Sequence, residues 1–148
     1  DIKSRIKTPE KDAPNLIPRI MKVLCGEEEK LEIYGSDYKT KDGTCIRDYI
    51  HVTDLARAHI NCIDYLKTSD ESLFLNLATG TGHSVLEVIR EVNRQSGIKI
   101  PFKFTRRREG DPSVVISNTK YKISPINWKP IYSDLKSIIS SVLCAYKL

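Results

Sequence analysis

Apolar residues recur along the chain with two different periods. After residues 15, 53, 84 and 133 they fall at the three- and four-residue intervals of an amphipathic helix. Between these stretches stand short apolar runs that are typical of strands, at residues 31–34, 46–52, 72–78, 100–104 and 114–116. Strands and helices therefore alternate along the chain, and this pattern predicts an α/β domain.

The sequence also indicates where the predicted helices begin. Small polar side chains with an oxygen that accepts from free backbone amides precede each of them, and the four expected caps are Asn15, Thr53, Ser84 and Ser133. Glu87 stands three residues after Ser84, which is the S-x-x-E pattern of a capping box. We expect residues 72–78 to form a buried strand just before this third helix.

Composition places the chain among ordinary globular proteins. It has 148 residues, of which 40% are hydrophobic and 29% charged, as expected for one domain with its own core. It contains no run of 18 apolar residues, so no membrane-spanning segment is predicted. We expect a polar leader at residues 1–14, which lacks the apolar stretch of a signal peptide, and a single domain at residues 15–148.

The four cysteines are far apart and form no C-x-x-C motif. Together with the three histidines they show no metal-ligand spacing, so no metal site is predicted. Free thiols in apolar surroundings are typical of a reducing compartment, and we expect a cytoplasmic protein.

The net charge of +5 raises the alternative of a small basic nucleic-acid-binding domain. Most of the cations are interleaved with acidic residues, however, and only Arg106, Arg107 and Arg108 form a tight run. A solvated basic face explains this pattern more simply. We therefore expect no nucleic-acid partner.

Several residues have the chemistry to bind an anionic ligand. The guanidinium groups of Arg47 and Arg108 suit phosphate oxygens, and the carboxylate of Asp111 suits vicinal sugar hydroxyls. The helix that starts after Asn15 offers amides and a positive end to a phosphate. The T-G-T-G turn at residues 79–82 also lies between a predicted strand and a helix, but it lacks a third glycine, which favours a simple tight turn.

Four segments resemble UDP-glucose 4-epimerases, which belong to the extended short-chain dehydrogenase/reductase family. They are YGSDYKTKDGTCIRDYIHVTDLARAH (34–59), NLATGTGHSVLEVI (76–89), RREGDP (107–112) and NWKP (127–130). The DYKTKDGT loop is longer than in related dehydratases and decarboxylases, which favours the 4-epimerase branch. The resemblance spans about residue 15 to the end and implies the small mixed α/β substrate-binding domain of such an enzyme, without its Rossmann domain.

The resemblance implies a set of contacts to a UDP-sugar. Asn15 and Leu16 match contacts to the diphosphate and sugar, and the backbone of the strand from Glu32 to Tyr34 matches the part that holds the uracil. The matched diphosphate ligands are Arg47 and Arg108, with Tyr49 beside Arg47, Asp111 on the ribose hydroxyls and Val115 at the position that sets the size of the sugar pocket.

The implied substrates are UDP-glucose and UDP-galactose. Because Val115 is small, we also expect UDP-N-acetyl sugars to be accepted. Family members hold NAD on a glycine-rich Rossmann domain and use a Y-x-x-x-K pair as base, and they form homodimers. The one Y-x-x-x-K in this chain, Tyr132 to Lys136, lies far from the expected place and is interpreted as a coincidence.

This comparison predicts no catalytic and no cofactor-binding residue in the chain. His51 and Asp54 are interpreted as scaffold, since in the family motif the aspartate occupies the first turn of a helix. We expect the chain alone to be inactive, with NAD and dimerisation belonging to the intact enzyme. A non-catalytic nucleotide-sugar-binding module, or a fragment of a decayed gene, remains an alternative.

Overall fold

The computed structural model describes residues 2, 3, 5, 13–117 and 124–148, so most of the predicted leader lies outside the described residues. Within this part of the chain the helices are α1 (Leu16–Leu24), α2 (Val52–Leu66), α3 (Val85–Ser96) and α4 (Leu135–Tyr146). The strands are β1 (Leu31–Tyr34), β2 (Ile46–Asp48), β3 (Gly82–Ser84), β4 (Phe102–Thr105) and β5 (Val114–Val115), with a 3₁₀ turn η1 (Ser124–Ile126). The predicted mixed α/β fold is confirmed.

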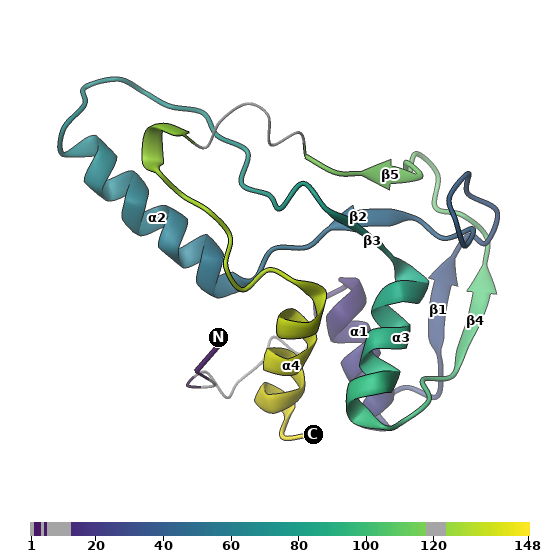
Figure 1. The fold of residues 1–148 in the computed structure, drawn as a ribbon. Coiled ribbons are helices and arrows are strands. Elements are labelled where there is room, and N and C mark those ends of the chain that lie inside the picture. The colour runs from purple at the N-terminus through teal and green to yellow at the C-terminus, as the bar shows by residue number, and fades with distance from the viewer. Residues whose placement is uncertain (1, 4, 6–12, 118–123) are drawn as a thin grey trace.

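The strands form two small sheets (Figure 1). In one sheet β1 pairs with β4 in parallel, and Leu31 stands opposite Phe102. In the other, β2 lies in the centre, antiparallel to β3 and parallel to β5. Arg47 in the middle of β2 stands between His83 and Val115.

The main core lies among α1, α3, α4 and the strand β1. Its fully buried side chains come from one face of each element, as the helical spacing predicted. They include Ile20, Met21, Leu31, Val88, Ile89, Val92, Ile100 and Ile139. Ser84 and Glu87 form the predicted capping box of α3, and Gly97 ends that helix in the left-handed conformation.

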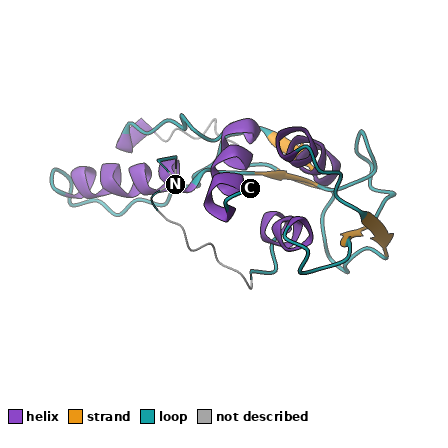
Figure 2. Ribbon diagram, turned by 90° about the horizontal axis from the view of Figure 1, so that it is seen from below, coloured by secondary structure: helices purple, strands orange, loops and turns teal. Residues whose placement is uncertain are grey.

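Helix α2 lies to one side of this core (Figures 1 and 2). It packs against η1 and the segment after it, where Ala58, Ile126 and Trp128 are buried. Its other face carries apolar side chains that remain largely exposed. They are Val52, Ile60, Ile63 and Leu66.

Asp54 joins α2 to the start of α4. Its side chain is fully buried, and Oδ2 accepts from the backbone amides of Ile131 and Tyr132 at 2.9 and 2.7 Å and from the Ser133 hydroxyl at 2.7 Å. Its Oδ1 lies 3.1 Å from a guanidinium nitrogen of Arg57. Burial raises the pKa of Asp54, but the hydrogen bonds outweigh burial and hold the pKa below its ordinary value. Asp54 thus lies in the first turn of its helix, as predicted, and its carboxylate links α2 to the segment before α4.

The predicted buried strand at residues 72–78 is wrong. The segment forms no strand, and the Phe74 side chain is 96% exposed. Leu75 and Leu77 do pack against the Trp128 cluster, which is the one-sided contact of a half-buried strand. The apolar pattern was therefore correct, but a strand also needs a neighbouring strand to bond its backbone, and no described strand takes that place.

Two predicted caps are also wrong. His51, and not Thr53, caps α2, because its Nδ1 accepts from the Thr53 amide at 3.0 Å. Asp134, and not Ser133, caps α4, and its carboxylate accepts from the amide of Ser137 at 2.9 Å. The hydroxyl of Ser133 is already committed to Asp54.

None of the helices in the described part of the chain is long and apolar enough to cross a membrane.

Candidate functional site

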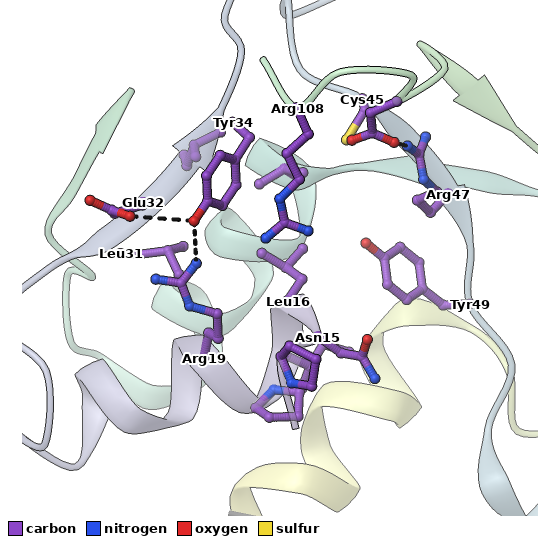
Figure 3. A pocket seen from close by; sticks show the side chains of 16 residues that line it. Asn15, Leu16, Arg19, Leu31, Glu32, Tyr34, Cys45, Arg47, Tyr49 and Arg108 are labelled. Atoms are coloured by element: carbon purple, nitrogen blue, oxygen red, sulfur yellow. Dashed lines mark hydrogen bonds and ion pairs between the residues drawn. The ribbon is translucent and has the colours of Figure 1, made fainter. Parts of the chain in front are cut away.

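A pocket of about 510 Å³ opens between the start of α1, the strand β1 and the segment around Arg108 (Figure 3). All eight residues predicted to bind substrate line it, which are Asn15, Leu16, Glu32, Tyr34, Arg47, Tyr49, Arg108 and Asp111. They come from four separate stretches of the chain. Folding therefore gathers residues that spacing alone could not connect.

The first turn of α1 forms one wall of the pocket. Asn15 is the N-cap residue, but its side chain makes no capping hydrogen bond, and the first turn contains no acidic residue. Leu16 and Ile17, whose amides are too early in the helix for an internal partner, line the pocket here. The positive end of the helix therefore faces the pocket.

The strand β1 offers its backbone on the other side. The amides of Leu31 and Gly35 donate to Pro101 and Thr105 next to and within β4, at 2.9 Å each. Because backbone groups alternate along a strand, the N–H and C=O groups of Glu32 and Tyr34 point away from β4. An edge with alternating donors and acceptors matches the edge of a nucleobase.

Three charged groups surround the Tyr34 ring. The guanidinium carbon of Arg108 lies 4.0 Å from the ring centroid and that of Arg19 lies 5.9 Å from it. The Tyr34 hydroxyl donates to Glu32 at 3.4 Å and accepts from Arg19 at 3.5 Å. Lys103 lies 2.6 Å from Glu32, and this hydrogen bond lowers the pKa of the Glu32 carboxyl. Arg108 is thus held over Tyr34 and points into the pocket (Figure 3).

Arg47 and Asp111 pair with each other. One Nη of Arg47 donates to Asp111, and the other donates to its own chain at the Ile46 carbonyl, 2.7 Å away. Both side chains are about one-quarter exposed. The two residues predicted to bind different parts of the ligand therefore bind each other in this state.

Tyr49 and Cys45 supply uncharged surface beside this pair. Burial raises the pKa of Tyr49 to about 12 and also raises the pKa of the Cys45 thiol. Both groups therefore stay neutral near pH 7. They do not offset the positive charge that the arginines bring to the pocket.

Val115, predicted to set the size of the sugar pocket, is outside the pocket lining. It pairs with Arg47 across β2 and β5, and its side chain is exposed. The structure places it one strand away from the lining residues.

The T-G-T-G turn holds a carboxylate of the protein itself. Asp48 accepts from the amides of Thr79 and Gly80 at 3.1 and 2.9 Å and from the Thr79 hydroxyl at 2.7 Å. This internal contact agrees with the favoured interpretation of a simple tight turn.

The residues that superficially resemble acid–base machinery lie elsewhere. His51 is buried, and its Nε2 lies 2.9 Å from the Ser141 hydroxyl while burial lowers its pKa. Neither Tyr132 nor Lys136 lines the pocket. In the described part of the chain, no group of three or more His, Cys, Asp or Glu residues is arranged to hold a metal ion.

Sequence reasoning missed Arg19 and Cys45 in the pocket lining. Arg19 follows Asn15 by four residues, so it lies on the same face of α1 as the cap. That helical spacing was available as a signal. Arg107, by contrast, does not line the pocket and stacks on Tyr38. The adjacent arginines Arg107 and Arg108 therefore contact different parts of the protein.

Comparison with known proteins agrees with this geometry. The sequence profile of the NAD dependent epimerase/dehydratase family matches residues 4–78, which is just over half of the chain. The chain belongs to this family. The match begins earlier than the predicted start of the resemblance near residue 15.

Members of the family with the same architecture include several UDP-glucose 4-epimerases. The one from Rhizobium leguminosarum bv. trifolii is 38% identical over 95% of the chain and 43% of its own length. The structure from Bifidobacterium longum, in complex with NAD+ and UDP, is 37% identical with a TM-score of 0.84, over 94% of this chain and 41% of that one. The UDP-Glc/GlcNAc 4-epimerase of Campylobacter jejuni is 41% identical with a TM-score of 0.80, over 99% and 44%.

The chain therefore spans less than half the length of these relatives. It corresponds to the carboxyl-terminal portion of the epimerase fold.

Proposed function

We propose that the pocket binds the UDP moiety of a UDP-sugar, and that the chain is the substrate-binding part of a UDP-glucose 4-epimerase. The observation that carries this proposal is the pocket itself, whose lining contains all eight residues that the family resemblance assigned to substrate. The sugars we propose are UDP-glucose and UDP-galactose. The bound UDP named for the Bifidobacterium relative is consistent with this assignment.

Each part of UDP has a chemically suited wall. The outward backbone of Glu32 and Tyr34 suits the uracil edge. The positive end of α1, together with Arg47 and Arg108, suits the diphosphate. Asp111 has the acceptor oxygens that a ribose diol needs. Helix end and arginines together give the pocket the positive charge that a diphosphate requires.

Calorimetric titration of the chain with UDP tests this assignment. We expect Arg47→Ala and Arg108→Ala each to weaken binding about tenfold or more, because each removes charge-assisted hydrogen bonds. Arg94→Ala is the matched control, since Arg94 lies on α3 and pairs with Glu91 outside the pocket. A folded chain that shows no heat with UDP, or equal losses in all three variants, would contradict the proposal.

We further propose that UDP-N-acetyl sugars are accepted as well. Val115 is a small residue next to Arg47, and the Campylobacter relative is named for both UDP-Glc and UDP-GlcNAc. Replacing Val115 with Trp should weaken UDP-N-acetylglucosamine more than UDP-glucose. Equal weakening of both ligands, or of neither, would contradict this role for Val115.

Catalysis, in this proposal, needs a second domain that brings NAD and the base. Two observations support it. The described pocket holds no tyrosine–lysine pair, and apolar side chains of α2 and residues 72–78 are exposed as if to be covered. The chain incubated with NAD and UDP-galactose should form no UDP-glucose. Detectable conversion would overturn this part of the proposal.

A further inference from the structure

One buried hydroxyl, that of Tyr38, has no hydrogen-bond partner among the described residues. Tyr38 lies in the loop between β1 and β2 and is only 5% exposed, yet its Oη forms no hydrogen bond within the described part of the chain. Buried hydroxyls are almost always bonded, because leaving water without a new partner is unfavourable. An orphan of this kind therefore calls for an explanation.

The Tyr38 ring cannot turn away to find a partner. A Cβ built on Gly35 would lie 2.5 Å from Tyr38 Cε2, so only glycine allows the ring to pack so closely on the backbone. The guanidinium carbon of Arg107 lies 4.2 Å from the centroid of the Tyr38 ring. Arg107 Nε in turn donates to Asp37 at 2.7 Å, which holds the guanidinium in place. The Tyr38 amide donates to the Gly43 carbonyl at 3.0 Å. Any partner must come to the hydroxyl.

The groups near Tyr38 belong to the pocket wall. Burial is the main cause that raises the pKa of Tyr38, and the negative charge of Asp111 raises it further, while Arg107 and Arg47 lower it. Cys45 is the remaining titratable neighbour. Tyr38 itself does not line the pocket, but three of the groups whose charges act on it, Cys45, Arg47 and Asp111, do.

This ion pair cannot persist unchanged around a diphosphate. An arriving diphosphate competes with Asp111 for the Arg47 guanidinium, and charge-assisted bonds to phosphate are strong. The carboxylate of Asp111 then loses its cation and stands close to a second anion, which is unfavourable unless other donors replace the lost ones. The Tyr38 hydroxyl is a neutral donor with no other partner among the described residues.

We propose that Tyr38 is the positioning residue for Asp111 in the nucleotide-bound pocket. When the diphosphate engages Arg47, the Tyr38 hydroxyl donates to the Asp111 carboxylate and orients its free oxygen toward the ribose diol. This inference rests on the proposed function, since it needs Asp111 to face a ribose. It assigns to the DYKTKDGT loop a role in nucleotide binding.

Tyr38→Phe removes only the hydroxyl and keeps the packed ring. We expect the dissociation constant for UDP to rise about threefold to tenfold, with unchanged circular dichroism. Tyr146→Phe is the matched control, because Tyr146 is a partly buried tyrosine at the far end of α4. Wild-type UDP affinity in Tyr38→Phe would overturn the proposal.

A ligand without the diol separates positioning from a structural role. Tyr38→Phe and the unsubstituted chain should bind 2′,3′-dideoxy-UDP with equal affinity, because this ligand has no ribose hydroxyls to donate to Asp111. If the variant weakens UDP and the dideoxy ligand equally, the hydroxyl acts on the pocket in general and the proposal fails.

A measurement without nucleotide keeps this proposal distinct from the proposed function. In Arg47→Ala the Asp111 carboxylate is released, so the Tyr38 hydroxyl should bond it and give a slowly exchanging hydroxyl proton in the NMR spectrum. That signal should vanish in Arg47→Ala combined with Tyr38→Phe or with Asp111→Asn. If the unsubstituted chain fails to bind UDP, the proposed function fails, while absence of this proton in Arg47→Ala overturns the role of Tyr38 independently.

Discussion

Two regions of this molecule bury their apolar residues very differently. The pocket lobe, made of α1, α3, α4, β1 and β4, encloses a continuous set of fully buried side chains. The α2 lobe, made of α2 and residues 72–78 and 124–130, buries only a small cluster around Trp128. It also exposes Ile60, Ile63, Leu66 and Phe74.

The difference separates a lobe with its own interior from a lobe that resembles half of an interface. Each apolar side chain buried in the pocket lobe contributes to its folding. In the α2 lobe comparable residues face water and contribute little until something covers them. The pocket should therefore keep its shape in the chain alone, whereas the α2 lobe should determine how the chain associates.

The largest expected contrast comes from the same substitution in both lobes. Ile139→Ala, at a fully buried position on α4, should lower the free energy of unfolding by about 3–4 kcal/mol. Ile63→Ala, at a position 57% exposed on α2, should change it by less than about 0.5 kcal/mol. Urea denaturation of both variants measures this. Similar losses in the two variants would remove the distinction between the lobes.

A somewhat smaller effect is expected where the lobes are joined. Asp54→Ala removes the acceptor of three hydrogen bonds between α2 and the segment before α4, and should cost about 3 kcal/mol. Asp64→Ala, an exposed position on the same helix that pairs with Lys67, should cost less than about 0.5 kcal/mol. Comparable losses at both positions would show that Asp54 is not the link.

The pKa of Asp54 predicts how this link responds to acid. Because the folded-state pKa lies below the ordinary value of 3.8, the charged carboxylate stabilises the fold above that pH. The contribution is lost as the pH falls through the lowered folded-state pKa. The stability difference between the unsubstituted chain and Asp54→Asn should therefore shrink when denaturation is measured below about pH 3.8. A difference that stays constant or grows in acid would reject this sign.

In the pocket itself, Arg108→Lys tests the stack on Tyr34 while it keeps the charge. Lysine lacks the planar fork, so UDP affinity should fall about threefold to tenfold, or about 1 kcal/mol. Titration calorimetry gives the value, and Arg94→Lys on α3 serves as the control. Full affinity in Arg108→Lys would mean that only the charge matters at this position.

The smallest effect on stability is expected at Phe74. Phe74→Ser should change the free energy of unfolding by less than about 0.5 kcal/mol, yet it should reduce concentration-dependent association in sedimentation, because it removes the most exposed aromatic ring of the α2 lobe. Ile98→Ser, at a half-exposed position between α3 and β4 of the pocket lobe, should leave sedimentation unchanged. The opposite ranking would place the associating surface in the pocket lobe.

The sequence predicted well wherever a pattern is local. Residues 31–34 form the predicted strand, and α1 begins after Asn15 as expected. The capping box at Ser84 is also present, because a cap needs only residues within one turn. The assembly of the pocket lining was predicted through family resemblance, and not from spacing, because its residues meet only in three dimensions.

Most of the failures share a physical cause, a dependence on a partner distant in sequence, whereas the wrong cap of α2 is a local error, because His51 stands two residues from the amide it bonds. Residues 72–78 have the pattern of a strand but no described neighbour to pair with. Ser133 has the side chain of a cap, but Asp54 takes its hydroxyl. Arg47 and Asp111, which pair with each other, are 64 positions apart in the sequence. The Tyr38 hydroxyl is recognised as unpaired only when its described three-dimensional surroundings are known.

Successive side chains of β2 point to opposite faces, and this alternation decides whether a positive or a negative side chain faces the pocket. Arg47 faces the pocket, and Asp48, the next residue, faces the T-G-T-G turn on the opposite side. A strand register shifted by one residue exchanges the two faces. A single-residue insertion or deletion at the start of β2 would then present an acid to the pocket and a base to the turn amides. Insertions and deletions in the preceding loop are therefore tolerated only if the register of β2 is unchanged. One that shifts the register would reverse the charge that faces the pocket and so abolish anion binding.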